Sequence, residues 1–318
     1  KNHFNKKKKY FSFYEQLKSI TILDNAFENY ENQVDWKFIS GLKNVNWSKT
    51  LIDKYIEYWD WNILSSNSSI PINDIFENYK NHLSYFHLMS NKSFNLTIDF
   101  IKNNEDKELN WFCISENTNL NWDLESIEHY KEKIKWYYFS SNFKFTKEMI
   151  VKFEKHINFK QLSHNENILF DYQIIKENEN KLDLQYLSSC KNISWSEKLI
   201  SDFSDKWDWD ALSNNENIKW TFDLIKKYDN KLSFDFNNKH PDYEQAGMHF
   251  GYSVYGLSSN KNIILSEELI EKYKEKWDWR KLSCNENFPW SEKLIKKYEK
   301  EWNWEILSRN QNLPFTLQ

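Results

Sequence analysis

The sequence contains very little glycine and proline, with four residues of each among its 318. A domain that uses many different tight turns usually needs more of both, because glycine allows positive φ angles and proline presets the geometry of a turn. Asparagine fills much of that role here, since it tolerates the left-handed region better than most residues do. The scarcity favours one kind of turn used repeatedly, in a chain long enough for two ordinary domains or one long repeat array.

Cysteine is scarce as well. The three cysteines, Cys113, Cys190 and Cys284, lie far apart and form no Cys-x-x-Cys pair. An odd and sparse count argues against a framework of disulfides and fits a reducing compartment. We therefore expect a cytoplasmic protein.

Long apolar runs are missing too. No stretch approaches the ~18 consecutive apolar residues of a membrane span. The first thirty residues are charged and aromatic and lack the apolar core of a signal peptide, although a leader removed before Lys1 is compatible with the sequence. We expect no association with a membrane.

The charge shows no excess of one sign that would indicate a polyanionic partner. The formal net charge is −4, and charged residues of both signs make up 28% of the chain and are mixed along it, as on a solvated helical surface. A nucleic-acid-binding protein more often shows a basic excess or stripe. The one basic run, residues 6–9, is typical of a solvated tail, with contact to an anionic partner as the alternative. We expect no nucleic-acid partner.

Aromatic residues are plentiful, with 16 Trp, 18 Tyr and 23 Phe, and many of them belong to an internal repeat. The motif Trp-x-x-Leu-Ser-x-Asn recurs along the chain, and its serine, which we call the marker serine, identifies each copy. Successive marker serines are 25 residues apart, except for one gap of 23 and one of 45. They are Ser40, Ser65, Ser90, Ser115, Ser140, Ser163, Ser188, Ser213, Ser258, Ser283 and Ser308.

Three further positions of the repeat have a constant character. The residue before each marker serine is apolar, for example Leu64 or Met89, and the fourth residue before it is aromatic in nine of eleven copies. The second residue after it is asparagine in eight copies, which are Asn67, Asn117, Asn142, Asn165, Asn215, Asn260, Asn285 and Asn310.

The stretch between Ser283 and Ser308 shows how one repeat folds. Leu294, Ile295 and Tyr298 lie on one stripe of a helix, and Ser291 is suited to cap its first turn. We expect a helix of about three turns that ends near Asn303. Residues suited to the same cap recur at Ser48, Asp123, Asp171, Ser196, Thr221, Ser266 and Thr316.

A second, shorter element follows each helix. Trp304 and Leu307 are three residues apart, which fits a single helical turn of the 3₁₀ type. Neither element can bury its apolar side alone, so the repeats must stack. The fold class is therefore all-α: an α-solenoid of about eleven 25-residue repeats over residues 34–318, preceded by a cap or degenerate repeat in residues 1–33.

A strand-lined horseshoe of leucine-rich repeats is the alternative, because those repeats have a similar period and a recurring asparagine. That fold needs an apolar residue between its leucine and its asparagine. Here the slot holds Ser189, Asn214 or Ser259, which disfavours it.

The motif, as in residues 209–218, resembles tandem repeats of uncharacterised proteins from giant viruses and AT-rich bacteria. Its plan of one helix and one short helix is similar to that of leucine-rich-variant solenoids, although their motif is absent. The first resemblance covers roughly residues 34–318. It implies a repeat scaffold and supplies neither catalytic residues nor a cofactor.

Three repeated features have both a functional and a structural interpretation. The serine and asparagine row either binds an extended peptide or satisfies backbone groups in a repeated turn. The tryptophan row either stacks on ligands or packs in the core. The row of helix N-termini either attracts anions or is already neutralised by glutamates such as Glu197 and Glu267. We expect the structural role in each case.

The longest departure from the repeat is an insertion at residues 237–253, with sequence NNKHPDYEQAGMHFGYS. Insertions in repeat arrays become loops on one face, often the binding face, although a tolerated excursion is the alternative. The candidate binding residues are His240, Asp242, Tyr243, Glu244, His249 and Tyr252.

Chemistry in the insertion is poorly supported. His240, Asp242 and His249 match no compact metal motif, so we expect no metal. No nucleophile elbow, phosphate-binding glycine loop or paired-carboxylate pattern accompanies them, so we expect no enzyme and no cofactor.

The sequence thus predicts a non-enzymatic scaffold that binds a protein partner through the solenoid surface and the 237–253 loop. A structural component of a larger assembly, with self-association, is the first alternative. A regulatory or enzymatic module centred on the insertion is the second.

Overall fold

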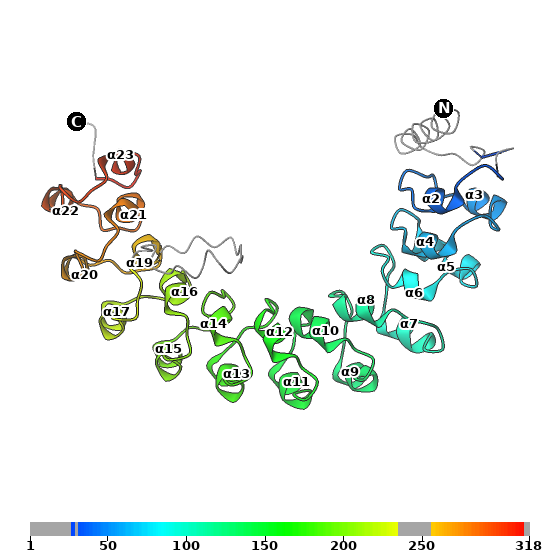
Figure 1. Cartoon of the computed structure of the whole chain (residues 1–318), viewed down its shortest axis with the longest axis horizontal. Helices are drawn as coiled ribbons and strands as arrows, with labels where there is room; N and C mark the ends of the chain where they lie inside the picture. The colour runs from blue at the N-terminus through cyan, green and yellow to red at the C-terminus, as the bar shows by residue number, and fades with distance from the viewer. Residues whose placement is uncertain (1–26, 29–30, 235–255, 315–318) are drawn as a thin grey trace, which may run out of the picture. The chain divides into compact units, whose positions relative to one another are not determined.

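The computed structural model describes residues 27–28, 31–234 and 256–314, and every regular element in these ranges is an α-helix. There are 21 such helices and no strand among the described residues, apart from isolated bridges that pair Phe170 with Ile193 and Trp220 with Ile263. The prediction of an all-α protein is confirmed for the described residues, which do not form the strands of a leucine-rich horseshoe (Figure 1).

Two kinds of helix alternate along the chain. The first kind, called first helices here, comprises α3 (Lys49–Lys54), α5 (Ile72–Tyr79), α7 (Ile98–Asn103), α9 (Leu124–Tyr130), α11 (Lys147–Lys152), α13 (Tyr172–Glu177), α15 (Glu197–Asp202), α17 (Phe222–Lys227), α20 (Glu267–Lys272) and α22 (Glu292–Lys297).

The second kind, called second helices here, carries the Trp-x-x-Leu-Ser motif or its counterpart. These helices are α2 (Trp36–Ser40), α4 (Trp61–Ser66), α6 (Tyr85–Leu88), α8 (Trp111–Glu116), α10 (Trp136–Asn142), α12 (Phe159–Ser163), α14 (Leu184–Leu187), α16 (Trp209–Asn214), α19 (Gly256–Ser259), α21 (Trp279–Cys284) and α23 (Trp304–Leu307).

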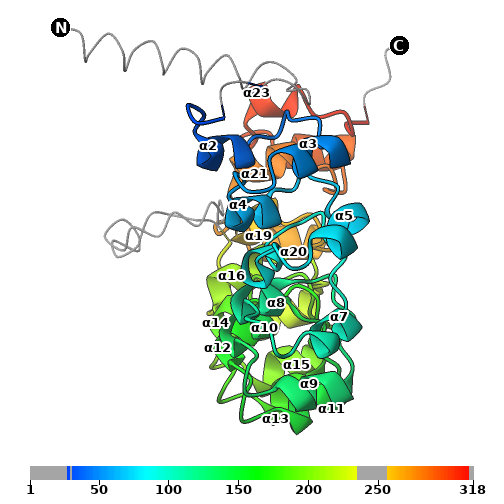
Figure 2. The same cartoon turned by 90° about the vertical axis from the view of Figure 1, so that its right-hand side faces the viewer.

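The chain divides into two compact parts, Lys1–Asn142 and Phe143–Gln318, which we call the N-terminal and C-terminal parts. Within each part, first helices form one row and second helices another beside it, as both views show (Figures 1 and 2). Several consecutive second helices touch, among them α4 and α6 in the N-terminal part and α21 and α23 in the C-terminal part.

The first helices begin at the predicted caps. The hydroxyl of Ser291 accepts a hydrogen bond from the backbone N–H of Leu294 at 3.3 Å, which satisfies one of the free donors of the first turn. Thr97 and Thr146 make the same bond at the starts of α7 and α11. Thr316 lies outside the described residues. The other predicted caps that make this bond are Ser48, Asp123, Asp171, Ser196, Thr221 and Ser266.

The predicted length of the first helices is wrong. Helix α22 ends at Lys297 and not near Asn303, because Tyr298 leaves the helical conformation with φ −111° and ψ 25°. The indole Nε1 of Trp302 then donates to the carbonyl of Ile295 at 3.1 Å. This side chain thereby satisfies a carbonyl that the shortened helix leaves without a backbone donor.

The second helices are α-helical and not 3₁₀, contrary to the prediction. In α4 the N–H of Leu64 donates to the carbonyl of Asp60, four residues earlier, at 2.9 Å. An N-cap stabilises this short helix, since the Asp60 carboxylate accepts from the N–H of Ile63. Equivalent caps are Asp35, Ser84, Asn110, Asn158, Asp183, Asp208, Asp278 and Asn303.

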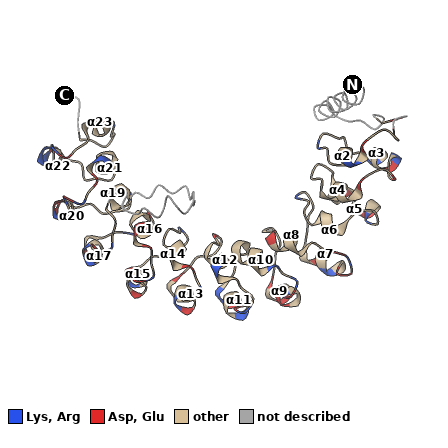
Figure 3. Ribbon diagram, in the orientation of Figure 1, with Lys and Arg blue, Asp and Glu red and all other residues tan. Residues whose placement is uncertain are grey.

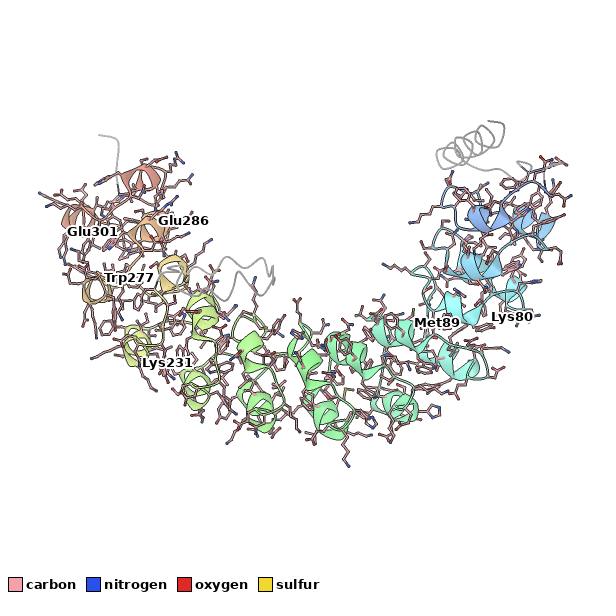
Figure 4. All side chains as sticks on the ribbon, in the orientation of Figure 1. Lys80, Met89, Lys231, Trp277, Glu286 and Glu301 are labelled. Atoms are coloured by element: carbon pink, nitrogen blue, oxygen red, sulfur yellow. The ribbon has the colours of Figure 1, made fainter. Side chains whose placement is uncertain are left out.

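One marker serine was assigned wrongly. Ser90 is exposed and follows α6, whereas Met89 is buried at the end of that helix (Figure 4). Met89 therefore holds the marker position, Leu88 the apolar position before it, and Tyr85 the aromatic position. Leu88 and Met89 are both apolar and both precede Ser90, so from the sequence either one can hold the apolar position of the repeat. Leu88 is fully buried in the structure, which assigns that position to it.

Candidate functional site

The marker serines join each second helix to the next one. In the repeat of Ser188, the hydroxyl donates to the carbonyl of Leu184 at 2.8 Å and accepts from the backbone N–H of Asp208 at 3.0 Å. Asp208 caps the following second helix. Seven other marker serines make both bonds, and they are Ser40, Ser65, Ser115, Ser163, Ser213, Ser258 and Ser283.

The marker serines accept hydrogen bonds from the following repeat, whereas the asparagines donate hydrogen bonds to the preceding repeat. The Asn215 Nδ2 donates to the carbonyls of Ser188 and Cys190, at 2.8 and 3.1 Å, and its Oδ1 accepts from the N–H of Asn217. This side chain is buried and its hydrogen-bonding atoms are used inside the protein. The same kind of donation to the preceding repeat comes from Asn67, Asn91, Asn165, Asn192, Asn260 and Asn310.

Two members of this asparagine row were missed from the sequence. Asn91 lies one residue before the expected place, because Met89 holds the marker position. Asn192 lies two residues after Cys190, which occupies the expected place, and its Nδ2 reaches the carbonyls of Asn165 and Ile168. The structural interpretation of the serine and asparagine row accounts for these contacts, and the row leaves these groups little capacity for a bound peptide.

The tryptophan row packs between repeats. The Trp279 ring lies 5.0 Å from the Tyr298 ring of the next repeat, and its Nε1 donates to the carbonyl of Lys274 at 3.1 Å. Trp209 and Tyr228 form the same pair at 4.7 Å. The two tyrosines are buried and the two tryptophans half-buried, so the arrangement matches core packing better than a stacking platform for bases or sugars.

The candidate binding residues of the insertion lie outside the described residues. They are His240, Asp242, Tyr243, Glu244, His249 and Tyr252. What the structure does describe is the chain on either side, at Phe234 and Gly256.

The insertion leaves and re-enters within a second helix. The N–H of Leu257 donates to the carbonyl of Ser233 at 2.9 Å, and Ser258 donates to the carbonyl of Phe234 through both its N–H and its hydroxyl. These are the bonds that Leu64 and Ser65 make to residues four positions earlier in α4. The helix hydrogen-bonding pattern thus closes across the insertion.

Phe234 takes the aromatic position of this interrupted repeat. Its ring lies 4.9 Å from Tyr273 and 4.8 Å from Trp277, as a tryptophan does elsewhere. Gly256 has a positive φ of 52°, and a Cβ there would lie 2.8 Å from the carbonyl oxygen of Ser233. Only glycine fits where the chain rejoins the helix.

An exposed aromatic row lies on the second helices of the N-terminal part. Phe86 in α6, Phe112 in α8 and Tyr137 in α10 are 38%, 40% and 52% exposed, and each follows the aromatic position of its helix. Other described repeats carry polar or charged residues at this position, namely Lys37, Asn62, Lys160, Gln185, Asp210, Arg280 and Glu305.

The titratable groups pair with one another across repeats. The Tyr79 hydroxyl donates to the Asp53 carboxylate at 2.6 Å, and burial, together with this bond, raises the pKa of Tyr79. Tyr273 pairs with Asp229 at 3.0 Å, and burial followed by that bond raises its pKa to about 12. The Glu105 carboxylate likewise accepts hydrogen bonds from the Tyr130 hydroxyl and from the His129 ring. These contacts link neighbouring first helices.

The cysteine thiols and the possible metal ligands of the described residues can be examined directly. Burial raises the pKa of the Cys190 thiol to about 12, which removes its thiolate at neutral pH. In the described ranges, no three His, Cys, Asp or Glu side chains are grouped so as to hold a metal ion. The helices of the described part include none with the length and apolar composition of a membrane span.

Comparisons of the chain with protein-family models, with curated proteins and with solved structures find no match in any of the three.

Proposed function

We propose that this protein is a non-enzymatic α-solenoid scaffold of about eleven repeats that binds a protein partner. The observation that carries the proposal is the separation of two sets of side chains. Marker serines and asparagines hold successive repeats together from inside, while the second position of most described second helices is exposed and varies from repeat to repeat. A constant internal ladder with a variable exposed position is what a repeat scaffold needs to recognise a partner.

The partner surfaces in this proposal are the row of second helices and the 237–253 loop. The insertion falls between Phe234, at the aromatic position, and Gly256, where other described repeats carry a single residue. An insertion there leaves the helix hydrogen bonds of Leu257 and Ser258 to Ser233 and Phe234 in place. Residues 34–318 form the solenoid in this proposal, with residues 1–33 as its cap. A cytoplasmic location also stays part of the proposal.

The proposal is tested with a deletion that the structure defines. Removing residues 235–254 joins Phe234 to Tyr255 and leaves Ser-Phe-Tyr-Gly-Leu-Ser-Ser-Asn, which parallels residues 60–67, Asp-Trp-Asn-Ile-Leu-Ser-Ser-Asn. We expect the deletion to shift the melting temperature by less than about 2 °C, because it restores an uninterrupted second helix. Circular dichroism gives the helical signal and the melting temperature of both chains.

Both chains are then used as bait in extracts of the native source, and a retained protein is identified, purified and titrated against each bait. A partner that binds the full chain alone places the site on the loop. A partner that binds both chains equally places it on the repeats. If neither bait retains a protein that rebinds in purified form, and the chain recovers only itself, the scaffold proposal fails in favour of self-assembly.

A further inference from the structure

The exposed aromatic row identifies the kind of segment that fits the N-terminal part. Phe86, Phe112 and Tyr137 occupy one equivalent position on three successive second helices, α6, α8 and α10. Within this row, the Phe112 ring lies 4.4 Å from Tyr138, and Tyr138 lies 5.0 Å from Tyr137, so the rings of α8 and α10 form one continuous cluster. Aromatic side chains are thus presented once per repeat along one side of this part.

The row is also nearly free of charge. Helices α6 and α10 contain no Lys, Arg, Asp or Glu, and α8 contains only Glu116, at its last residue. Figure 3 shows that the charged residues lie mainly along the row of first helices and that the ribbon of α4 and α6 contains none. An uncharged aromatic surface is complementary to a segment that has apolar side chains and no charge.

The size of the row excludes a large interface. The exposed fractions of the three side chains amount to roughly 200–300 Å² of aromatic surface. A stable dimer buries about 800 Å² on each partner. A second copy of the chain therefore needs more surface than this row provides, whereas a short peptide segment does not.

The spacing of the row matches one backbone conformation in particular. Helices α8 and α10 are in contact, and packed helices lie roughly 8–10 Å apart, so the Phe112 and Tyr137 rings recur at about that distance. A polyproline II helix has three residues per turn and rises ~3.1 Å per residue, so every third side chain recurs on one side after ~9.3 Å. An α-helix repeats every ~5.4 Å, so only side chains two turns apart meet successive rings.

We propose that Phe86, Phe112 and Tyr137 form a docking site for an uncharged, proline-rich segment of a partner protein in the polyproline II conformation. One apolar side chain of each turn lies against one aromatic ring. The prolines supply a conformation that is already ordered before binding, and aromatic rings are the surface on which such segments dock in other recognition modules. This inference rests on the proposed scaffold function and names its partner class.

The probe is a fluorescein-labelled peptide of four Pro-Pro-Leu triplets, titrated against the full chain by fluorescence anisotropy. A control peptide has the same composition but carries its leucines at every second position. We expect the triplet peptide to bind the full chain at least about fivefold more tightly than the control peptide, because only its leucines match the rings.

The test variant replaces the three rings with polar residues that the chain itself uses at this position, as Phe86→Asn, Phe112→Asn and Tyr137→Gln. The matched control makes three changes at the same position in the C-terminal part, Lys160→Asn, Asp210→Asn and Gln185→Asn. We expect the aromatic triple variant to lose about tenfold or more in affinity for the triplet peptide and the matched control to bind as the unchanged chain does. Circular dichroism confirms that each variant is folded.

Three results overturn the inference. In the first, the triplet and control peptides bind the full chain equally well. In the second, the aromatic triple variant and the matched control have the same affinity for the triplet peptide. In the third, sedimentation shows a dimer that only the aromatic triple variant loses, which makes the row a self-association surface. The bait experiment separates this failure from that of the scaffold itself. If the chain does not bind the triplet peptide but still captures and rebinds a protein partner, the polyproline site is refuted and the scaffold function is not.

Discussion

The replacement Ser188→Ala removes one connection between two neighbouring second helices. The Ser188 side chain is fully buried, and its hydroxyl is the acceptor for the backbone N–H of Asp208. Alanine leaves that donor without its partner, whereas the Leu184 carbonyl keeps the N–H of Ser188 itself at 3.1 Å. An orphaned buried donor costs about 1–3 kcal/mol, and because Asp208 is half-buried we expect about 1–2 kcal/mol.

The neighbouring residue provides the control for this prediction. Ser189 is exposed, and its hydroxyl donates to the Tyr186 carbonyl at 2.9 Å within the same turn. Ser189→Ala therefore removes a serine hydroxyl without removing a link between repeats, and we expect a change within about 0.5 kcal/mol. Urea unfolding followed by circular dichroism gives the free energy of unfolding for both variants.

Hydrogen exchange adds a local measurement, because a repeat array can unfold in segments and not in one step. The Asp208 amide should exchange faster in Ser188→Ala than in Ser189→Ala. Equal free energies of unfolding for the two variants, together with equal exchange at Asp208, would show that the marker serine does not hold the repeats together.

Two further predictions concern other contacts between and within repeats. Trp277 and Trp207 are equally buried, but only Trp277 donates through Nε1 to a carbonyl, so Trp277→Phe should lower the free energy of urea unfolding by about 1 kcal/mol more than Trp207→Phe. Hydrogen bonds from Lys49 and then Tyr79 hold the pKa of Asp53 below its ordinary 3.8, so its contribution to stability is present above that value and lost as pH falls. Asp53→Asn should therefore weaken the dependence of the urea midpoint on pH below 4, and an unchanged acid profile would contradict this.

The parts of the fold that depend on local sequence could be predicted. Ser291 is followed by two charged residues and then by paired apolar residues, so its capping role and the buried stripe of α22 follow from neighbouring positions alone. The end of that helix could not be predicted in the same way. It depends on Trp302 reaching back seven residues to the Ile295 carbonyl, a contact that exists only once the chain has turned.

The register of the third repeat and the candidate site failed for a related reason. Ser90 is a serine, as the marker position requires, but it is exposed, whereas the marker position is buried. The burial of Leu88 arises only when the repeats stack and cannot be read from the sequence. With Ser90 as the marker, Phe86 falls at the aromatic position of the repeat, whereas in the structure Tyr85 holds that position and Phe86 is exposed. A one-residue ambiguity in the sequence therefore concealed the first member of the exposed aromatic row.

The closing of α19 across its insertion has a consequence for engineering. Ser233, Phe234, Leu257 and Ser258 reproduce the hydrogen bonds of an unbroken helix although twenty extra residues separate them. The exposed second position of a second helix is thus a natural grafting point, where a foreign loop enters and leaves through adjacent residues. A glycine at the rejoining residue, as at Gly256, is the one local requirement that the structure identifies. The same junction transferred to α4 or α16 would let a designer display a chosen peptide at a chosen repeat.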